Sequence, residues 1–281
     1  MRPPRGGPAL ALAAAALLAG CASGLRIDES YSARSQDSRV QHIVLHYTTG
    51  SFAGALKVLT EGRVSSHYLV RREPPSILRL VPEDRRAFHA GLSSWEGVNG
   101  INASSIGIEI DNAGFIDHAQ GRYTPFDAAQ IDQVIALVAD IAKRHGVKPH
   151  RIVGHSDIAP TRKQDPGPLF PWQRLADAGL VPWPDAAQVE AARAAFEADG
   201  ATLPDIAWFQ SRLAQAGYAV PRHGQADAET RDVLVAFQMK YRPRLFNGRP
   251  DAETAALLQV ITTPGGLLIA DDQGRRQPYQ R

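Results

Sequence analysis

The chain has a single cysteine, Cys21, among its 281 residues. One cysteine excludes an internal disulfide and any metal site built from paired cysteines. Basic and acidic residues nearly balance, 31 against 29, which leaves a formal net charge of +2. This balance gives no reason to expect binding to nucleic acid through bulk charge. With 44% hydrophobic residues the composition excludes a disordered chain, and the length suits one medium domain plus a small one.

Long apolar runs are also scarce. The run Ala9–Ala19 follows Arg2 and Arg5 and is too short to cross a bilayer as a stable helix. It ends in the letters LAGC, which resemble the lipobox of bacterial lipoproteins. The resemblance implies that residues 1–21 carry a signal peptide, cut before Cys21, and that this cysteine is lipidated. The alternative is a plain signal peptide with an incidental cysteine.

The residues after Cys21 bear on localisation. Ala22 stands where an aspartate would favour retention at the inner membrane, so the resemblance to Gram-negative lipoproteins implies the periplasmic face of the outer membrane. Residues 22–37 are rich in serine, arginine and aspartate without an apolar period, and we expect a tether there.

Apolar periodicity predicts an α/β domain over residues 38–182. Strands are expected at 40–45, 66–71, 77–81, 105–111 and 152–153, and helices at 52–62 and 125–144. Between them, residues 83–103 form a long irregular segment with His89 and Trp95. Long loops in compact domains are usually functional. We therefore expect His89 and Trp95, together with Asn112, to line a substrate cleft, with packing against the domain as the alternative for the first two.

The composition shifts after residue 182. Residues 183–200 are rich in alanine and glutamate and are predicted to be a helical linker. Residues 201–262 contain an internal repeat, GQADAET at Gly224–Thr230 and GRPDAET at Gly248–Thr254, in which each aspartate can cap a helix. With a further helix upstream, this predicts a small three-helix bundle. Residues 263–281 are polar without a pattern, and we expect a disordered tail.

The stretch GHSDIAPTRKQDPGPLFPW, residues 154–172, combines potential metal ligands with four prolines that stiffen a loop. His155 and Asp165 are both zinc-ligand types, and His46 ends the first predicted strand. The three would form a catalytic zinc set with one position left for water. We interpret Asp157 as a residue that caps or orients this loop.

Two further residues are candidates for the chemistry. Glu109 would act as a general base, and Lys163 would stabilise an oxyanion. Taken alone, Glu109 also fits the polar face of a half-buried strand, and Lys163 an ordinary surface lysine. His67 is interpreted as a core or supporting histidine, because a fourth protein ligand would close the site to water.

Five motifs together resemble the zinc-dependent N-acetylmuramoyl-L-alanine amidases of the amidase-2 type, a family whose fold is shared by the peptidoglycan-recognition proteins. They are HIVLHYT, SSHYLV, AFHAG, SIGIEIDN and GHSDIAPTRKQDPGP. The resemblance covers residues 38–182 and implies a mixed central sheet flanked by helices. It also implies one Zn²⁺ held by His46, His155 and Asp165, with catalytic roles for Glu109 and Lys163. The implied reaction is hydrolysis of the amide between N-acetylmuramic acid and L-alanine.

The second unit resembles peptidoglycan-binding domains of type 1, through FQSRLAQAGY at 209–218 and the run 227–238. The expected partners are therefore peptidoglycan or muropeptides and, through the lipid, a membrane. We expect a monomer and no nucleic-acid partner. Two alternatives stay open: a noncatalytic peptidoglycan-recognition module, and a zinc peptidase that cuts within the stem peptide.

Overall fold

The computed structural model describes residues 27–117 and 122–281. The predicted signal segment and the lipidation site Cys21 lie outside the described residues. The chain divides into two compact units, Met1–Gln36 and Asp37–Arg281, and residues 27–41 form neither helix nor strand. Within the described ranges, no helix is long and apolar enough to cross a membrane.

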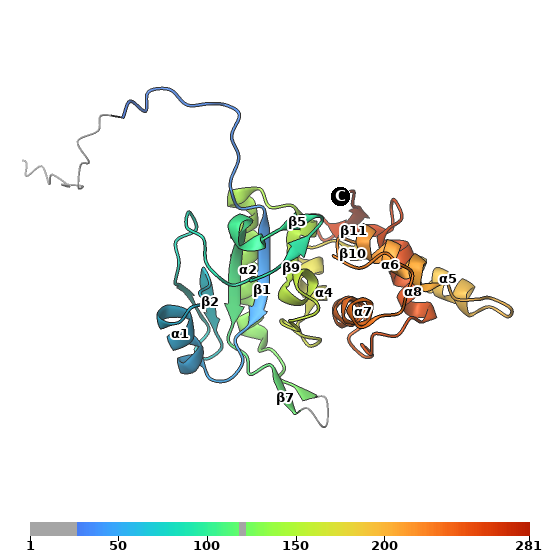
Figure 1. Ribbon diagram of the computed structural model, residues 1–281. Coiled ribbons are helices and arrows are strands. Elements are labelled where there is room, and N and C mark those ends of the chain that lie inside the picture. Colours follow the sequence, from blue (N-terminus) through green and yellow to red (C-terminus); the bar gives the residue numbers. More distant parts are fainter. Residues whose placement is uncertain (1–26, 118–121) are drawn as a thin grey trace, which may run out of the picture. The chain divides into compact units, whose positions relative to one another are not determined.

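A five-stranded mixed sheet lies at the centre of the second unit, as expected (Figure 1). Its order is β3-β2-β6-β1-β9. The strands are β1 (His42–Tyr47), β2 (Tyr68–Arg71), β3 (Ser76–Arg79), β6 (Ser105–Ile110) and β9 (Ile152–Gly154). β1 runs parallel to both β6 and β9, β2 runs parallel to β6, and only β3 of these strands is antiparallel to its neighbour.

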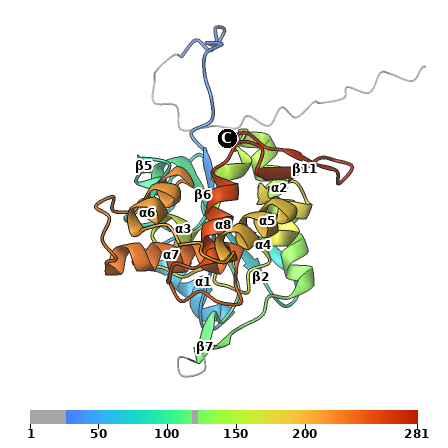
Figure 2. The ribbon, with the colours of Figure 1, turned by 90° about the vertical axis from the view of Figure 1, so that its right-hand side faces the viewer.

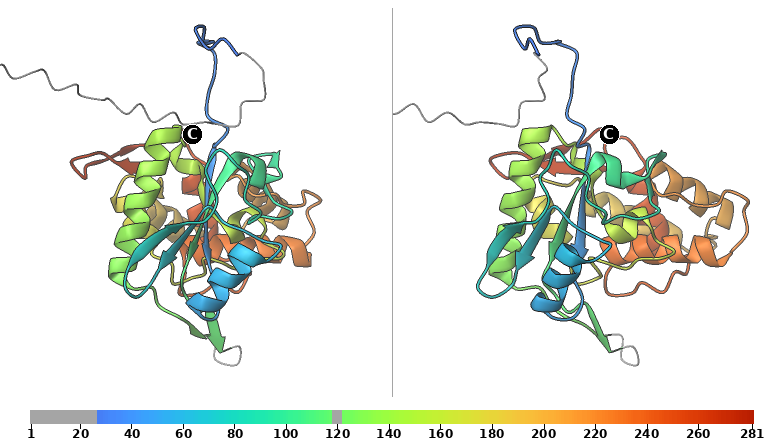
Figure 3. Two further views of the ribbon diagram at one scale, coloured as in Figure 1. Left: turned by 90° about the vertical axis from the view of Figure 1, so that its left-hand side faces the viewer. Right: turned by 60° about the vertical axis from the view of Figure 1, so that its left-hand side comes forward.

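Side-chain alternation gives the sheet two different faces. Isoleucines and leucines of β1 and β6 point toward α2 (Ala128–His145), which covers one face (Figure 3). Asp127 caps the start of α2, and Gly146 ends it with a φ of 68°. The opposite face carries Val44 and, near the strand ends, His46 and Glu109. The sheet therefore places its polar side chains away from α2.

Short elements complete the first part of the unit. They are α1 (Phe52–Glu61), β4 (Ser94–Trp95), β5 (Val98–Asn99), η1 (Ile101–Ser104), β7 (Phe115–Asp117), β8 (Arg122–Tyr123), η2 (Pro149–Arg151), α3 (His155–Ile158) and α4 (Trp172–Asp177). The segment 83–103, predicted to be irregular, thus contains a small hairpin, because Ser94 and Trp95 pair with Asn99 and Val98.

The predicted three-helix bundle consists of α6 (Ile206–Gln215), α7 (Ala228–Tyr241) and α8 (Ala252–Ile261). The sequence repeat has a structural counterpart. Asp227 and Asp251 cap α7 and α8 by accepting the backbone N–H of Thr230 and Thr254. Both caps follow a glycine turn with positive φ, so each copy of the repeat starts one helix.

Two buried glutamines extend this repeat upstream. Gln210 Oε1 accepts from the backbone N–H of Gly224 at 2.8 Å, and its Nε2 donates to Thr230 Oγ1 at 2.8 Å. Gln238 makes the same pair of bonds one repeat later, with the Gly248 N–H at 2.8 Å and Thr254 Oγ1 at 3.0 Å. Each glutamine therefore ties one helix to the turn that starts the next.

The prediction of a disordered tail at 263–281 is wrong. The segment forms β11 (Leu267–Ala270) and β12 (Arg276–Pro278), which join β10 (Trp183–Pro184) in a three-stranded sheet of order β10-β11-β12. Asp271 organises the hairpin, because its side chain accepts from the N–H groups of residues 273 and 275. The strands are short and their turn is polar, so apolar periodicity does not reveal them.

Residues 183–200 are also a packed part of the fold rather than a free linker. α5 (Ala186–Glu197), capped by Asp185, is the expected helix, and it packs against α8. The Trp183 ring lies 5.2 Å from the Tyr241 ring, centroid to centroid. The segment therefore packs against the bundle through Trp183 and one side of α5.

A second hydrophobic core joins the bundle to the face of the sheet opposite α2. It combines Val44, Val153 and Ile158 with Phe209 and Phe237. Figure 2, viewed from the bundle side, shows α6, α7 and α8 in front of the sheet. The bundle and the sheet therefore share buried apolar side chains.

Candidate metal centre

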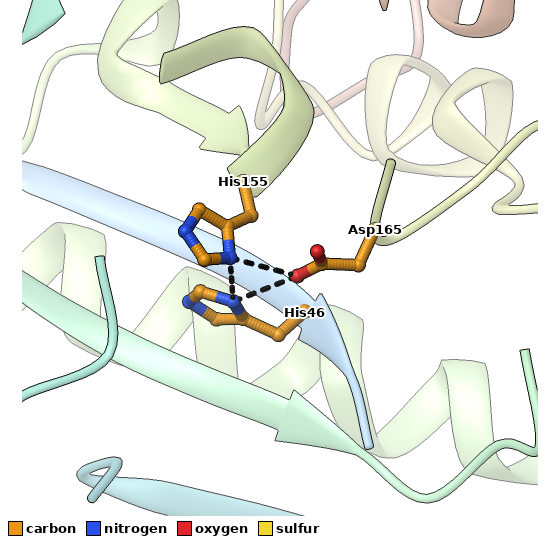
Figure 4. A group of neighbouring side chains, drawn as sticks. All are labelled: His46, His155 and Asp165. Carbon is orange, nitrogen blue, oxygen red and sulfur yellow. Dashed lines mark hydrogen bonds and ion pairs between the residues drawn. The ribbon is translucent and has the colours of Figure 1, made fainter. Parts of the chain in front are cut away.

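Three side chains predicted as metal ligands meet in the structure. His46 lies on β1, His155 begins α3 directly after β9, and Asp165 lies in the following loop (Figure 4). His46 Nδ1 is 3.0 Å from His155 Nδ1 and 2.9 Å from Asp165 Oδ2, and His155 Nδ1 is 3.0 Å from the same oxygen. All three residues are buried. Because β1 and β9 are paired neighbours, the sheet itself brings the two histidines together.

Hydrogen bonds behind both rings orient the Nδ1 atoms toward Asp165. His155 Nε2 lies 3.2 Å from the carbonyl oxygen of Ala90 and donates to it. His46 Nε2 lies 3.0 Å from His89 Nδ1, and His89 Nε2 lies 3.0 Å from Ser105 Oγ. Metal-binding histidines typically donate their other ring N–H in this way. Two such imidazoles and one carboxylate fit a divalent metal such as zinc, which takes nitrogen and oxygen ligands.

The protonation states also suit a metal. Burial, and secondarily the neighbouring His155, lower the pKa of His46 to about 4. Burial disfavours the charged form of Asp165, but hydrogen bonds with His155 and His46 outweigh it and hold its pKa below the ordinary value. At neutral pH the cluster therefore presents a neutral imidazole at His46 and a carboxylate at Asp165, the forms that coordinate metals.

Glu109 lies beside this cluster on β6, in register with His46 on β1. Glu109 as a whole is half-buried. Its Oε2 atom is buried and has no hydrogen-bond partner among the described residues. Burial, reinforced by the charge of Asp165 and opposed by Lys163, raises the pKa of Glu109 well above its ordinary value. A buried, unpartnered carboxyl group of raised pKa is typical of a group that exchanges protons.

A cavity of about 420 Å³ opens onto these residues. Lys163, whose backbone N–H donates to the Ala159 carbonyl oxygen, lines the cavity together with Glu109 and the three clustered residues. The helix α1 forms another wall. The predicted metal ligands and both predicted catalytic residues thus face one space.

His89 lines the same cavity, but its ring is already engaged on both nitrogens. Gly107 makes room for it, since a Cβ atom there would lie 2.5 Å from the His89 ring. The prediction placed His89 at the substrate. His89 does line the cavity, as predicted, and its ring also lies against His46, where it supports that residue.

Trp95 does not line the cavity, contrary to the prediction. Its side chain is buried, its Nε1 donates to the His150 carbonyl oxygen at 3.1 Å, and its ring lies 5.1 Å from that of Tyr218. The packing alternative was therefore correct for Trp95, because the bundle covers this side of the segment.

Asn112 is also not available to a substrate. It is buried, and its Nδ2 donates to the carbonyl oxygens of Thr124 and Pro125 at 3.2 Å each. Its Oδ1 accepts from the Gly114 N–H at 2.7 Å. Asn112 therefore holds the loop after β6, and the expectation that it contacts substrate is wrong.

His67 is a supporting residue, as interpreted. Its Nδ1 accepts from the Gly107 N–H at 3.0 Å, and its Nε2 donates to the Arg85 carbonyl oxygen at 3.0 Å. Asp157 caps α3 as interpreted, since its Oδ2 accepts from the Gly154 N–H at 2.8 Å. Sequence reasoning missed its two other partners, Tyr218 and Lys240, which lie 61 and 83 residues away along the chain.

Two family models match the chain. The N-acetylmuramoyl-L-alanine amidase model covers residues 36–168, and a peptidoglycan-binding-domain model covers residues 202–258. The first contains the metal cluster and the cavity, and the second contains the helices α6 and α7 and most of α8.

Similar proteins span nearly the same length. N-acetylmuramoyl-L-alanine amidase AmiD of Escherichia coli (strain K12) is 44% identical over 268 residues, which cover 89% of this chain and 95% of AmiD. The solved complex of AmiD with anhydro-N-acetylmuramic acid-L-Ala-D-γ-Glu-L-Lys aligns with a TM-score of 0.75 and 42% identity, covering 84% of this chain and 93% of that chain. The solved complex of AmpDh3 of Pseudomonas aeruginosa with an anhydromuramic pentapeptide aligns with a TM-score of 0.77 and 39% identity. The alignment covers 84% of this chain and 96% of that chain. By this identity and coverage, the chain belongs to the N-acetylmuramoyl-L-alanine amidase family.

Proposed function

We propose that this protein is a zinc-dependent N-acetylmuramoyl-L-alanine amidase that hydrolyses the amide between N-acetylmuramic acid and L-alanine in peptidoglycan or muropeptides. The observation that carries the proposal is the buried His46–His155–Asp165 cluster with Glu109 beside it in one cavity. The Oε2 atom of Glu109 has no hydrogen-bond partner in the part of the chain that the structure describes. The muramyl-peptide complexes of AmiD and AmpDh3 support this substrate class.

The residues that would hold the metal are His46, His155 and Asp165, one Zn²⁺ per chain. When bound, zinc supplies Lewis acidity, which polarises a carbonyl and lowers the pKa of water. The chain's own contribution is to present two oriented imidazoles and one carboxylate in a buried place, with hydrogen bonds that fix both rings. Fixing the ligands in advance lowers the cost of reaching the reactive geometry.

Glu109 would act as the proton carrier. Its carboxylate form, made more basic by the raised pKa, would accept a proton from the attacking water, and the resulting carboxylic acid would pass that proton to the leaving amine nitrogen of L-alanine. Lys163 would place its ammonium group near the carbonyl oxygen, where negative charge develops as the carbonyl carbon becomes tetrahedral. The two residues thus divide the work between proton transfer and charge stabilisation.

We further propose the division of labour along the chain. Residues 38–182 would carry the chemistry, and residues 201–262 would bind peptidoglycan, which raises the local concentration of scissile bonds. The apolar run Ala9–Ala19 and the lipobox-like end at Cys21 support a lipid anchor. The tether that follows would hold the enzyme at the periplasmic face of the outer membrane of a Gram-negative bacterium.

Product analysis tests the proposal. The chain from residue 22 on is incubated with purified peptidoglycan, with and without a chelator, and the products are identified by mass. We expect free stem peptides that begin with L-alanine, lost on chelation and restored by zinc. His155→Ala should abolish hydrolysis while sacculus binding is retained. Uncut material held by the wild-type protein would favour a recognition module, and cuts within the stem peptide would favour a peptidase.

A further inference from the structure

Asp157 connects the metal centre to the C-terminal bundle. It lies in α3, two residues after His155, and its Oδ2 accepts from the N–H of Gly154, the residue before that histidine. The N–H of Ser156, the residue after His155, donates to the backbone carbonyl oxygen of Asp165 at 2.8 Å. These two bonds therefore fix the backbone on both sides of His155, and the second one connects it to Asp165, another predicted metal ligand.

The other partners of the Asp157 carboxylate come from the bundle. Tyr218 Oη donates to Oδ1 at 2.7 Å, and Lys240 Nζ donates to Oδ2 at 2.7 Å. The side chains of Asp157 and Lys240 are 1% and 9% exposed. The carboxylate thus has one partner in its own turn and two from the bundle.

The surroundings of the two bundle residues are fixed by packing. The Lys240 ammonium lies 4.2 Å from the centre of the Trp172 ring, and the Tyr218 ring packs against Trp95. Gly217 permits this approach, because a Cβ atom there would lie 2.9 Å from the Trp95 ring. A buried carboxylate that loses its cation is strongly destabilised. Removing the bundle contacts should therefore disturb α3, and with it the position of His155.

We propose that Lys240 and Tyr218 are positioning residues for the metal centre: through Asp157, the C-terminal bundle sets the metal affinity and the catalytic rate, in addition to binding peptidoglycan. The inference deepens the proposed function and rests on it for the reaction, whereas the effect on metal affinity stands on the contacts alone. A bundle that only binds the cell wall would leave metal affinity and the cleavage of small soluble substrates unchanged.

The test uses the chain from residue 22 on, and substitutes Lys240→Met, Tyr218→Phe and Asp157→Asn. Methionine keeps the length of the lysine stem beside Trp172 and removes the charge. The zinc dissociation constant is measured by competition with a chromophoric chelator, and kcat and KM are measured on a soluble anhydromuramyl tripeptide. For Lys240→Met we expect zinc binding about tenfold weaker and a lower kcat at unchanged KM, as for other residues that support metal ligands.

Arg242→Met is the matched control. Arg242 is also a buried cation at the end of α7, but its partners, Asp251 and Glu253, belong to the bundle. Its loss should lower the stability of the bundle and leave the zinc dissociation constant unchanged. A general loss of bundle stability is thereby separated from an effect that passes through Asp157.

The double variant Asp157→Asn with Lys240→Met completes the cycle. If Lys240 acts through Asp157, the double variant should bind zinc no more weakly than Asp157→Asn alone. Additive losses would overturn the inference, and so would wild-type zinc affinity in both Lys240→Met and Tyr218→Phe. Tyr218→Phe, which removes one oxygen, decides the matter if Lys240→Met does not fold. A wild-type chain that binds zinc but releases no stem peptide would refute the proposed reaction, while the dissociation constants would still decide this inference.

Discussion

His46 and Glu109 lie directly opposite each other on the neighbouring parallel strands β1 and β6. Side chains in register on adjacent strands point to the same face of a sheet. The carboxyl group therefore reaches the metal centre from a rigid element and not from a loop. The proposed proton carrier, Glu109, is therefore a different residue from the metal ligands. A substitution at Glu109 can remove proton transfer without removing a ligand.

Replacing Glu109 by glutamine should leave the metal centre intact and remove the proton carrier. The amide keeps the shape of the side chain but cannot accept the proton from water. We expect kcat to fall by about 10²- to 10⁴-fold, the usual contribution of a general base. Steady-state kinetics on a soluble muropeptide, with zinc content determined on the same sample, checks this. Near wild-type turnover at full zinc occupancy would exclude Glu109 as the base.

Replacing Lys163 by methionine should change the pH profile as well as the rate. Burial and Asp165 raise the pKa of Glu109, and Lys163 opposes them. Without the lysine the pKa rises further, so the base form is lost at a higher pH. We expect the acidic limb of kcat/KM, measured from about pH 5 to about pH 9, to shift to higher pH. A shift to lower pH, or none, would contradict the prediction that Lys163 lowers the pKa of Glu109.

His89 should contribute to metal affinity by orienting His46. Replacing it by alanine removes the acceptor for His46 Nε2, and such losses weaken metal binding by about 10- to 100-fold. Competition with a chelator measures the change. His42→Ala is the matched control, because His42 lies on β1 with His46, is also buried and bonds to Ser104 away from the metal centre. If both variants lose zinc alike, the effect comes from general destabilisation of β1.

Glu83 should contribute stability that depends on pH. It accepts hydrogen bonds from Tyr68 at 2.7 Å and from Arg144, and it contacts His145 at 2.9 Å. Hydrogen bonds with Arg144 are the largest cause of a pKa lowered from 4.5 to about 2. The lowered value means that the stabilisation is complete above pH 4.5 and is lost as the pH falls toward 2.

Glu83→Gln tests this pH dependence. We expect the variant to lose about 2 kcal/mol of unfolding free energy at neutral pH, the scale of hydrogen bonds to charged groups. Urea denaturation at several pH values should show the difference from wild type shrinking as the pH falls below the ordinary glutamate pKa. A difference that stays constant with pH would show that ionisation of Glu83 is not its source.

The sequence predicted the catalytic part of the fold well, because its signals are local. β-branched runs predicted the central strands, and the motif that contains His155, Lys163 and Asp165 indicated the metal centre through its resemblance to the amidase family. His46 could be placed at the end of one strand and Glu109 on the polar face of another. That they stand in register depends on strand order, which no local pattern determines.

Where the predictions failed, long-range packing decided the outcome. Trp95 is an aromatic residue in a long segment, and in the structure it is buried against Tyr218 of the bundle and bonded to the His150 carbonyl oxygen. Asn112 looked free because its partners, the carbonyl groups of Thr124 and Pro125, have no sequence signature. The tail was predicted to be disordered because it is polar without an apolar pattern. Its strand β11 forms by pairing with β10, a strand of two residues that lies far away along the chain.

The pairing of β10 with β11 brings the entry and the exit of the bundle to the same place. A domain attached by one flexible linker takes many orientations, whereas a domain attached at both of its ends is held in one orientation. Glycan held by such a module would pass the cavity along a single line, with its stem peptides presented at a constant interval from the point of attachment. If residues 201–262 bind glycan as proposed, the bond that is cut would therefore lie at a fixed distance from the bound sugar.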